Sequence, residues 1–267
     1  MYNLEIARSF SYQKIDDETM KLCSDVGIKQ IEFGVCGISV DFDDAEIAEL
    51  IDRCVEIIHR HNIKILSVHL PFGPTWELCT CDDAIREHAM NSYIRLIKIC
   101  SRIKPERFVL HPGYPRVPVE ERERRIENFR KNVAILSAEA MPAKIAVENM
   151  PQDCLGNTAD ELIRLVDGID NVCVCCDMNH WFHEKTYDAV RKLGKRIETI
   201  HVSDYDEEVE KHWLPGQGTN DWNKILGELD KIGYRGPFMY ECSQVNPSDV
   251  VAANKRELFE NYNNSAE

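Results

Sequence analysis

Acidic and histidine residues recur at or just after the ends of short apolar segments in this sequence. Six of them fall at equivalent places: His69, His111, Glu148, Asp177, His201 and Glu241. A single residue of this kind is more often a loop anchor or a hydrogen-bonded cap than a ligand. Six together are a stronger signal, because burying so many polar groups is costly unless something compensates them. A divalent cation would provide that compensation.

The residue types also indicate which cation would bind. Two Glu, one Asp and one His from this group would make a hard, oxygen-rich set of ligands. Carboxylate oxygens are hard ligands that suit Mg²⁺, Mn²⁺ or Co²⁺, and the imidazole also permits Zn²⁺. The sequence therefore predicts an oxygen-rich divalent metal site.

Short apolar, β-branched runs alternate with longer amphipathic stretches along the chain. The predicted strands are residues 4–8, 30–34, 64–69, 107–111, 144–149, 172–177, 199–203 and 237–242. The predicted helices lie near residues 16–26, 44–61, 84–102, 120–140, 158–166, 186–193, 222–232 and 247–262. This alternation implies parallel pairing through right-handed crossovers. We therefore expect an α/β fold, with residues 1–267 forming a single (β/α)8 TIM barrel domain and an open doubly wound sheet as the alternative.

A barrel of this type would gather the polar residues at one end. Functional groups of (β/α) barrels lie at the C-terminal ends of the strands and come from several strands. The predicted strands three to eight would each bring a His, Asp or Glu to that rim. Cys173 and Cys175 share strand parity with Asp177, so we expect them to fill the barrel interior below it. Asp16 and Thr158 are expected helix N-caps, as is Asp221.

Length and composition limit the class of protein. The chain has 267 residues, with 32 Lys and Arg against 46 Asp and Glu and a net charge of −14. Its 43% hydrophobic residues and only 13 Gly and 11 Pro exclude a disordered or low-complexity chain. The acidity argues against binding of nucleic acid or anionic lipid, and no apolar run has the length of a membrane span. Eleven cysteines, an odd number, and no recognisable secretory signal predict a reducing, cytoplasmic location.

Seven segments, in this order, point to a known family. They are SVHLPFG, FVLHPG, IAVENM, CCDMNH, IHVSDYD, KHWLPGQGTNDW and FMYECS. Together they resemble the xylose isomerase-like barrel superfamily, which includes sugar isomerases and epimerases, inosose dehydratases and the endonuclease IV class. The resemblance covers residues 63–242, and its most specific part is His-x-x-Pro-Gly-x-Gly followed by Asp-Trp.

The resemblance implies a role for each matched residue. The four metal ligands shared by the isomerase and epimerase branches match Glu148, Asp177, His201 and Glu241. His180 matches a histidine that faces the substrate or the metal. His69 and His111 match positions that hold additional metals in the nuclease branch. Glu210 and His212 occupy that branch's Asp-x-His pair, with Glu in place of Asp.

Two features depart from particular branches of the superfamily. Ketose 3-epimerases carry a second Glu six residues after the metal-binding Glu, where this chain has Cys154. The segment PFGPTWELCTCDD contains no Lys or Arg, although the nuclease branch would need phosphate contacts there. The first departure weakens assignment to the 3-epimerases, and the second argues against a nuclease.

We therefore expect a divalent-metal-dependent isomerase or epimerase that acts on a small sugar, sugar phosphate or keto-sugar. The resemblance implies a metal that binds the carbonyl and its neighbouring hydroxyl and stabilises a cis-enediolate. Glu148 and Glu241 would then transfer protons on the two faces of that intermediate. The residues expected to contact the substrate are His69, His111, His180, His212 and Trp76, with Phe72 and Trp181 as further apolar walls.

Other functions stay open at this point. A dehydratase of the inosose type would expel a β-hydroxyl after the same proton removal. An endonuclease IV-like phosphodiesterase would cut abasic DNA with several zinc ions, and its additional ligands would be His69, His111, His180, Glu210 and His212. A sugar- or metal-binding protein without turnover is the remaining alternative. The expected partners are a small sugar-like substrate and a second copy in a homodimer, with no nucleic acid and no membrane.

Overall fold

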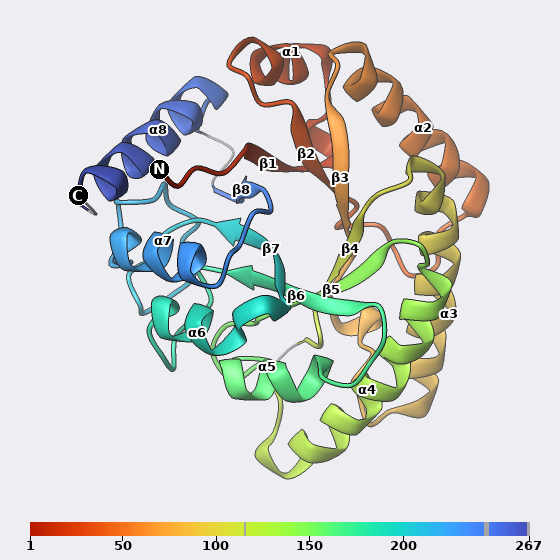
Figure 1. Cartoon of the computed structure of the whole chain (residues 1–267). Helices are drawn as coiled ribbons and strands as arrows, with labels where there is room; N and C mark the ends of the chain where they lie inside the picture. The colour runs from red at the N-terminus through yellow and green to blue at the C-terminus, as the bar shows by residue number, and fades with distance from the viewer. Residues whose placement is uncertain (115, 243–245, 266–267) are drawn as a thin grey trace.

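Eight parallel strands close into a barrel at the centre of the structure (Figure 1), as the alternation of segments predicted. The computed structural model describes residues 1–114, 116–242 and 246–265. The strands are β1 (Ile6–Ser11), β2 (Gln30–Gly34), β3 (Lys64–His69), β4 (Arg107–Leu110), β5 (Lys144–Glu148), β6 (Val172–Asp177), β7 (Ile197–Val202) and β8 (Phe238–Tyr240). Each strand pairs with the next, and β8 pairs with β1. The (β/α)8 barrel is confirmed, and the open-sheet alternative is wrong.

Eight α-helices of the described chain surround the barrel (Figure 1). They are α1 (Asp17–Asp25), α2 (Asp44–Arg60), α3 (Asp83–Cys100), α4 (Arg122–Glu139), α5 (Ala159–Val166), α6 (Thr186–Leu193), α7 (Trp222–Lys231) and α8 (Ser248–Ser265). Each covers the sheet with an apolar face, as Leu162 and Leu165 do in α5. The predicted N-caps Asp16, Thr158 and Asp221 are confirmed, because each side chain accepts a backbone N–H from the first turn.

The largest difference from the predicted strands lies at the N-terminus. β1 spans Ile6–Ser11 rather than residues 4–8, so it begins two residues later and ends three residues later than predicted. The residues before it belong to the outer layer, where Tyr2 packs against Phe259 of α8. The Tyr2 backbone N–H also donates to Oδ1 of Asn263, 2.9 Å away. A short apolar run such as this one can either join the sheet or pack in the outer layer against a helix, and periodicity alone does not separate the two.

The barrel interior holds a small apolar cluster of Val109, Ala146, Cys173 and Cys175. This confirms that the two cysteines are packing residues, and burial raises the pKa of the Cys173 thiol to about 12. All eleven cysteines are free thiols. None of the described helices is long and apolar enough to cross a membrane.

Strand register sets the height of the polar residues in the barrel. Asp177, the last residue of β6, is the register partner of His201 on β7. A register shift between Val174 and Cys175 precedes this pair, and such irregularities often re-aim side chains at barrel rims. Glu148 ends β5, so β5, β6 and β7 bring polar groups to the same C-terminal rim.

Candidate metal and substrate site

Four predicted ligands meet at this rim. Their ligand atoms all lie within 4.8 Å of one another, and the residues are Glu148, Asp177, His201 and Glu241. His201 Nδ1 lies 3.0 Å from Glu148 Oε1 and 2.7 Å from Glu241 Oε2. Asp177 Oδ2 lies 4.0 Å from the same nitrogen. The structure therefore brings together the whole set that was expected to hold a divalent metal.

Neighbouring asparagines hold Asp177 firmly. Asn149 Nδ2 donates to the Asp177 carbonyl at 3.0 Å, and its Oδ1 accepts the Asp177 N–H at 2.7 Å. The Asn179 N–H donates to Asp177 Oδ1 at 2.6 Å. The other carboxylate oxygen, Oδ2, is buried without a hydrogen-bond partner. His180 Nδ1 lies 3.5 Å from this oxygen. A buried oxygen without a hydrogen bond on a fixed residue needs an explanation, and a bound cation would supply one.

Three histidines of the rim are anchored through Nδ1. This atom lies 2.8–2.9 Å from a backbone carbonyl in each, with the pairs being His69–Leu70, His180–Asn149 and His212–Glu241. A carbonyl only accepts, so Nδ1 carries the proton and the neutral ring has its lone pair on Nε2. The Nε2 atoms face carboxylates: His69 faces Glu148 at 3.2 Å, and His180 and His212 face Glu210 at 3.4 and 2.6 Å. Two acceptors this close need a proton or a cation between them, so the donor set fits a metal.

His111 is held differently from the other three. Its Nε2 lies 3.2 Å from Glu148 Oε2, and its buried Nδ1 has no hydrogen-bond partner. Its ring stacks on Phe72 with centroids 4.3 Å apart and an angle of 22° between planes. The Phe72 side chain is 44% exposed and lines the pocket above the ligands. Phe72 therefore both orients His111 and forms an apolar wall.

A second candidate metal group consists of His180, Glu210 and His212. The last two residues come from the long segment between β7 and α7, and Asp204 organises this segment. Its carboxylate accepts the N–H groups of Gly216, Asn220 and the Trp222 indole at 2.8, 3.2 and 3.0 Å. The Asp204 backbone also forms an isolated antiparallel bridge with Trp213.

The packing of this segment explains the most specific sequence motif. A Cβ added at Gly218 would lie 2.2 Å from the Tyr205 carbonyl oxygen and 2.5 Å from Asp204 Oδ1, so only glycine fits. Gly216 has a φ of +89°, which also favours glycine. The Pro-Gly-x-Gly and Asp-Trp elements thus wrap around Asp204 and fix the segment that carries His212.

The charges at the rim influence one another strongly. Burial raises the pKa of Asp177 to about 7, against the opposing effect of His180. Burial acts to lower the pKa of His180, but Asp177 and Glu210 raise it to about 10. His212 behaves similarly, since Glu210 overcomes burial and raises its pKa to about 9. These histidines therefore hold protons that balance the carboxylates, and a cation bound there would have to displace them.

A pocket of about 260 Å³ opens onto these residues. Four histidines, three glutamates and Phe72 are among the described residues that line it, and none of the lining residues is Lys or Arg. Its volume is close to the lower end of small-molecule sites, which begin at roughly 300 Å³. The pocket is therefore suited to a small molecule rich in hydrogen-bonding groups.

The structure corrects the expectation that Trp76 contacts the substrate. Its side chain is only 5% exposed and does not line the pocket. Nε1 of Trp76 donates to the Ile38 carbonyl at 3.1 Å, and the indole packs against Phe42 and against Tyr93 of α3. The short 3₁₀ turn containing Trp76 directs the ring toward the helix layer, so this residue belongs to the core.

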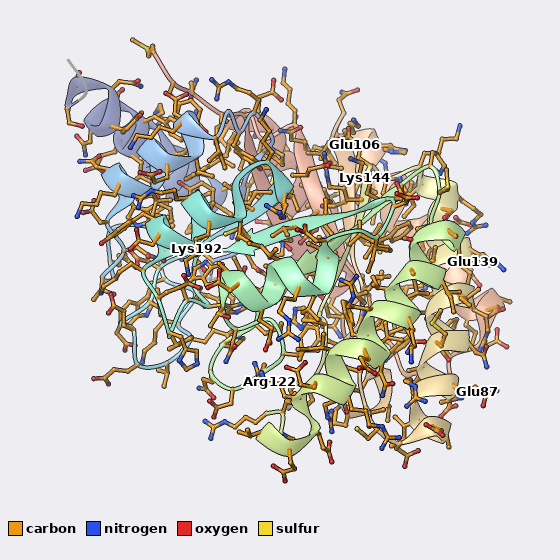
Figure 2. The ribbon with its side chains drawn as sticks, turned by 60° about the horizontal axis from the view of Figure 1, so that its bottom comes forward. Glu87, Glu106, Arg122, Glu139, Lys144 and Lys192 are labelled. Carbon is orange, nitrogen blue, oxygen red and sulfur yellow. The ribbon has the colours of Figure 1, made fainter. Side chains whose placement is uncertain are left out.

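The loop after β5 brings no second carboxylate from position 154 into the pocket. Cys154, which stands where ketose 3-epimerases have Glu, does not line the pocket. Arg122 at the start of α4 (Figure 2) fixes this loop by donating to the Cys154 carbonyl at 2.8 Å and to Glu161 Oε2 at 2.6 Å. Trp181 is also buried away from the pocket. Of the three predicted aromatic walls, only Phe72 lines it.

One buried carboxylate next to the candidate ligands was not predicted. Glu32 on β2 is 0% exposed, and its Oε1 lies 2.9 Å from His201 Nε2. A search for polar residues at strand ends does not find it, because it lies within its strand. The available signal is a Glu inside an otherwise apolar segment, since a buried carboxylate is rare unless it is paired.

A larger hollow of about 540 Å³ lies at the opposite end of the barrel, where the strands begin. Its charged side chains pair with one another, as Lys64 does with Glu106 and Arg107 with Glu198. Figure 2 shows Glu106 beside Lys144 at this end, away from Arg122. Active sites of such barrels lie at the C-terminal ends of the strands, so we place the chemistry in the smaller pocket.

Known proteins similar to this chain include epimerases and an endonuclease. The sequence pattern of the xylose isomerase-like TIM barrel family matches residues 20–262. The structure of a D-tagatose 3-epimerase-like protein shares the fold, with a TM-score of 0.82 and 21% identity over 99% of this chain and 100% of that one. D-psicose 3-epimerase of Ruminiclostridium cellulolyticum is 26% identical over 215 residues, which are 75% of this chain and 69% of that protein. Apurinic-apyrimidinic endonuclease 1 of Schizosaccharomyces pombe is 26% identical over 155 residues, or 56% and 44%.

Proposed function

The chain belongs to the xylose isomerase-like TIM barrel family, and on this premise we propose that it is a divalent-metal-dependent isomerase or epimerase of a small sugar or keto-sugar. The main support is the arrangement of Glu148 and Glu241, whose carboxylates both contact His201 Nδ1 while lining the pocket. Two glutamates beside a candidate metal site can remove a proton and return one. The similarity to D-psicose 3-epimerase agrees with this chemistry.

The proposed reaction assigns a task to each group of residues. The cation would be held by Glu148, Asp177, His201 and Glu241. When bound, it would supply Lewis-acid polarisation of a substrate carbonyl. One glutamate then takes the proton from the carbon beside the carbonyl, and the other delivers a proton to the substrate. Such positioned acid–base groups typically contribute about 10²–10⁴-fold to the rate.

The other pocket residues would orient the substrate. His180 and His212 are fixed through Nδ1, and their Nε2 atoms face Glu210 at 3.4 and 2.6 Å. A substrate hydroxyl group or a second cation bound to these Nε2 atoms would take the place of a proton shared with Glu210. Phe72 would cover an apolar face of the sugar ring or chain. The absence of Lys and Arg from the described lining favours a substrate without a phosphate group at this position.

The test is a product assay on a panel of ketoses and aldoses with Mn²⁺, Mg²⁺ or Co²⁺ supplied separately. We expect one sugar to be converted to its isomer or epimer only when a metal is present, with NMR identifying the product. A dehydrated product would instead favour the inosose dehydratase type of reaction. Full activity after exhaustive chelation would contradict the proposal.

A phosphodiesterase is the second candidate, and the group of His180, Glu210 and His212 specifically favours it. With His69 and His111 beside Glu148, the rim has enough ligands for more than one metal. The endonuclease relative agrees with that reading, whereas the acidic, Lys- and Arg-free pocket lining does not. Three tightly bound zinc ions per chain together with cleavage of an abasic DNA duplex would establish this alternative.

A further inference from the structure

Glu32 is a fully buried carboxylate for which the proposed reaction provides no role. Its register partners are Ser9 on β1 and Ser67 on β3, so the three residues lie at one height on adjacent strands. Ser67 Oγ donates to Glu32 Oε2 at 2.7 Å, and Ser9 Oγ donates to Oε1 at 3.1 Å. The register shifts between Ile31 and Glu32, an irregularity that re-aims side chains beside active sites.

The third neighbour of this carboxylate comes from across the barrel. His201 Nε2 on β7 lies 2.9 Å from Glu32 Oε1. The two atoms lie within ion-pair distance but form no well-aligned hydrogen bond. Even so, a carboxylate oxygen only accepts, and Nε2 has no other hydrogen-bond partner. A proton on Nε2 is therefore the arrangement that Glu32 favours.

The second nitrogen of the same ring has different surroundings. His201 Nδ1 faces Glu148 and Glu241, the residues proposed to hold the cation. An imidazole that binds a metal through one nitrogen keeps a proton on the other, and a carboxylate partner at that position fixes both the tautomer and the ring orientation. Glu32 is correctly placed to be this partner.

We propose that Glu32 is a positioning residue that keeps the proton of His201 on Nε2 and so assigns Nδ1 to the divalent cation. The inference rests on the proposed function, because it concerns the same metal group. Loss of the Nε2 proton would leave a buried carboxylate opposite a bare nitrogen, which is costly. Glu32 itself contacts neither substrate nor metal in this account.

The tautomer can be observed directly. We expect the ¹⁵N-histidine NMR spectrum of the wild-type protein with bound Zn²⁺, a diamagnetic probe, to show His201 protonated at Nε2 and metallated at Nδ1. A His201 ring protonated at Nδ1 would overturn the inference and leave the metal site itself intact. Failure of the wild-type protein to bind Zn²⁺, Mn²⁺, Mg²⁺ or Co²⁺ would refute the proposed function, and the inference with it.

Substitution supplies the second test. Glu32→Gln removes the charge with little change of shape, and we expect Mn²⁺ affinity to fall about 10–100-fold. Glu228→Gln is the matched control, because Glu228 is a buried carboxylate of α7 paired with Arg191, and it should leave Mn²⁺ affinity unchanged. Equal affinity of Glu32→Gln and wild type would contradict the inference. If Glu32→Gln does not fold, Ser67→Ala takes its place, and we expect it to weaken Mn²⁺ binding severalfold. The tautomer of His201 in the wild-type protein tests the inference independently of both variants.

Discussion

His201 Nδ1 lies 2.7 Å from Glu241 Oε2, so a ring on β7 meets the carboxylate that directly follows β8. The contact depends on barrel closure, because Glu241 is placed by the short strand β8 between β7 and β1. The second glutamate, Glu148 at the end of β5, contacts the same His201 nitrogen. The proposed proton transfer uses these two glutamates, which makes them the first residues to change.

We expect Glu241→Gln to lower kcat/KM for the substrate by about 10²–10⁴-fold, because the amide cannot accept a proton from carbon. Part of this loss should appear as weaker metal binding, since Glu241 is also a candidate ligand, so assays need saturating Mn²⁺. Glu207→Gln, which alters an exposed carboxylate paired with Lys185, should retain wild-type activity. Unchanged turnover by Glu241→Gln at saturating Mn²⁺ would remove this residue from the mechanism.

Metal binding should become tighter as pH rises. Burial raises the pKa of Asp177 to about 7, so near that pH the carboxyl is partly protonated and must lose its proton to bind a cation. Below about pH 7 each released proton should weaken the apparent affinity roughly tenfold per pH unit. Mn²⁺ titration calorimetry in two buffers of different ionisation enthalpy measures this release directly. Binding that is independent of pH and releases no proton would show that Asp177 is not a ligand.

Asp204→Asn should loosen the segment that carries Glu210 and His212. Both oxygens of Asp204 accept N–H groups, so the amide nitrogen of Asn would face donors instead of acceptors. We expect a cost of about 2–4 kcal/mol in the local stability of this segment and a higher KM. Hydrogen exchange of residues 205–221 would detect it. The surface change Asp230→Asn is the control, and protection equal to wild type in Asp204→Asn would contradict the assignment.

Trp76 and Phe72 should separate stability from substrate binding. Trp76→Ala leaves a cavity in the core and should lower the free energy of unfolding by about 3–5 kcal/mol. Phe72→Ala removes a half-exposed ring and should cost about 1 kcal/mol or less, while raising KM through loss of the wall and of the stack on His111. Urea unfolding and steady-state kinetics of both variants give the comparison. The reverse pattern would mean that Trp76, and not Phe72, forms the pocket.

The barrel was predictable because alternating apolar and amphipathic segments leave few ways to bury their faces. The rim residues were predictable for a related reason, since parallel strands in a barrel all end at one rim. The assignment of β6 and β7 as adjacent strands was therefore enough to predict that Asp177 and His201 lie close together. Helix caps such as Thr158 followed from local hydrogen bonding alone.

Other features depend on three-dimensional packing that no sequence period encodes. Trp76 follows His69 closely enough to suggest the pocket, yet the turn that bears it places the indole in the core. Glu32 reaches His201 only because β2 and β7 face each other across the barrel. The first strand, predicted over residues 4–8, is displaced to Ile6–Ser11, because the segment before it packs against α8 through Tyr2 and Phe259.

Transfer of solvent deuterium into the substrate tests the central claim most directly. In D₂O with Mn²⁺, the wild-type protein should place deuterium on the carbon beside the carbonyl of its sugar, as read by NMR. Glu148→Gln should reduce this incorporation by about 10²-fold or more, and chelation of the metal should abolish it. Conversion of the sugar without any deuterium at that carbon, or equal incorporation by Glu148→Gln, would contradict proton transfer by these glutamates.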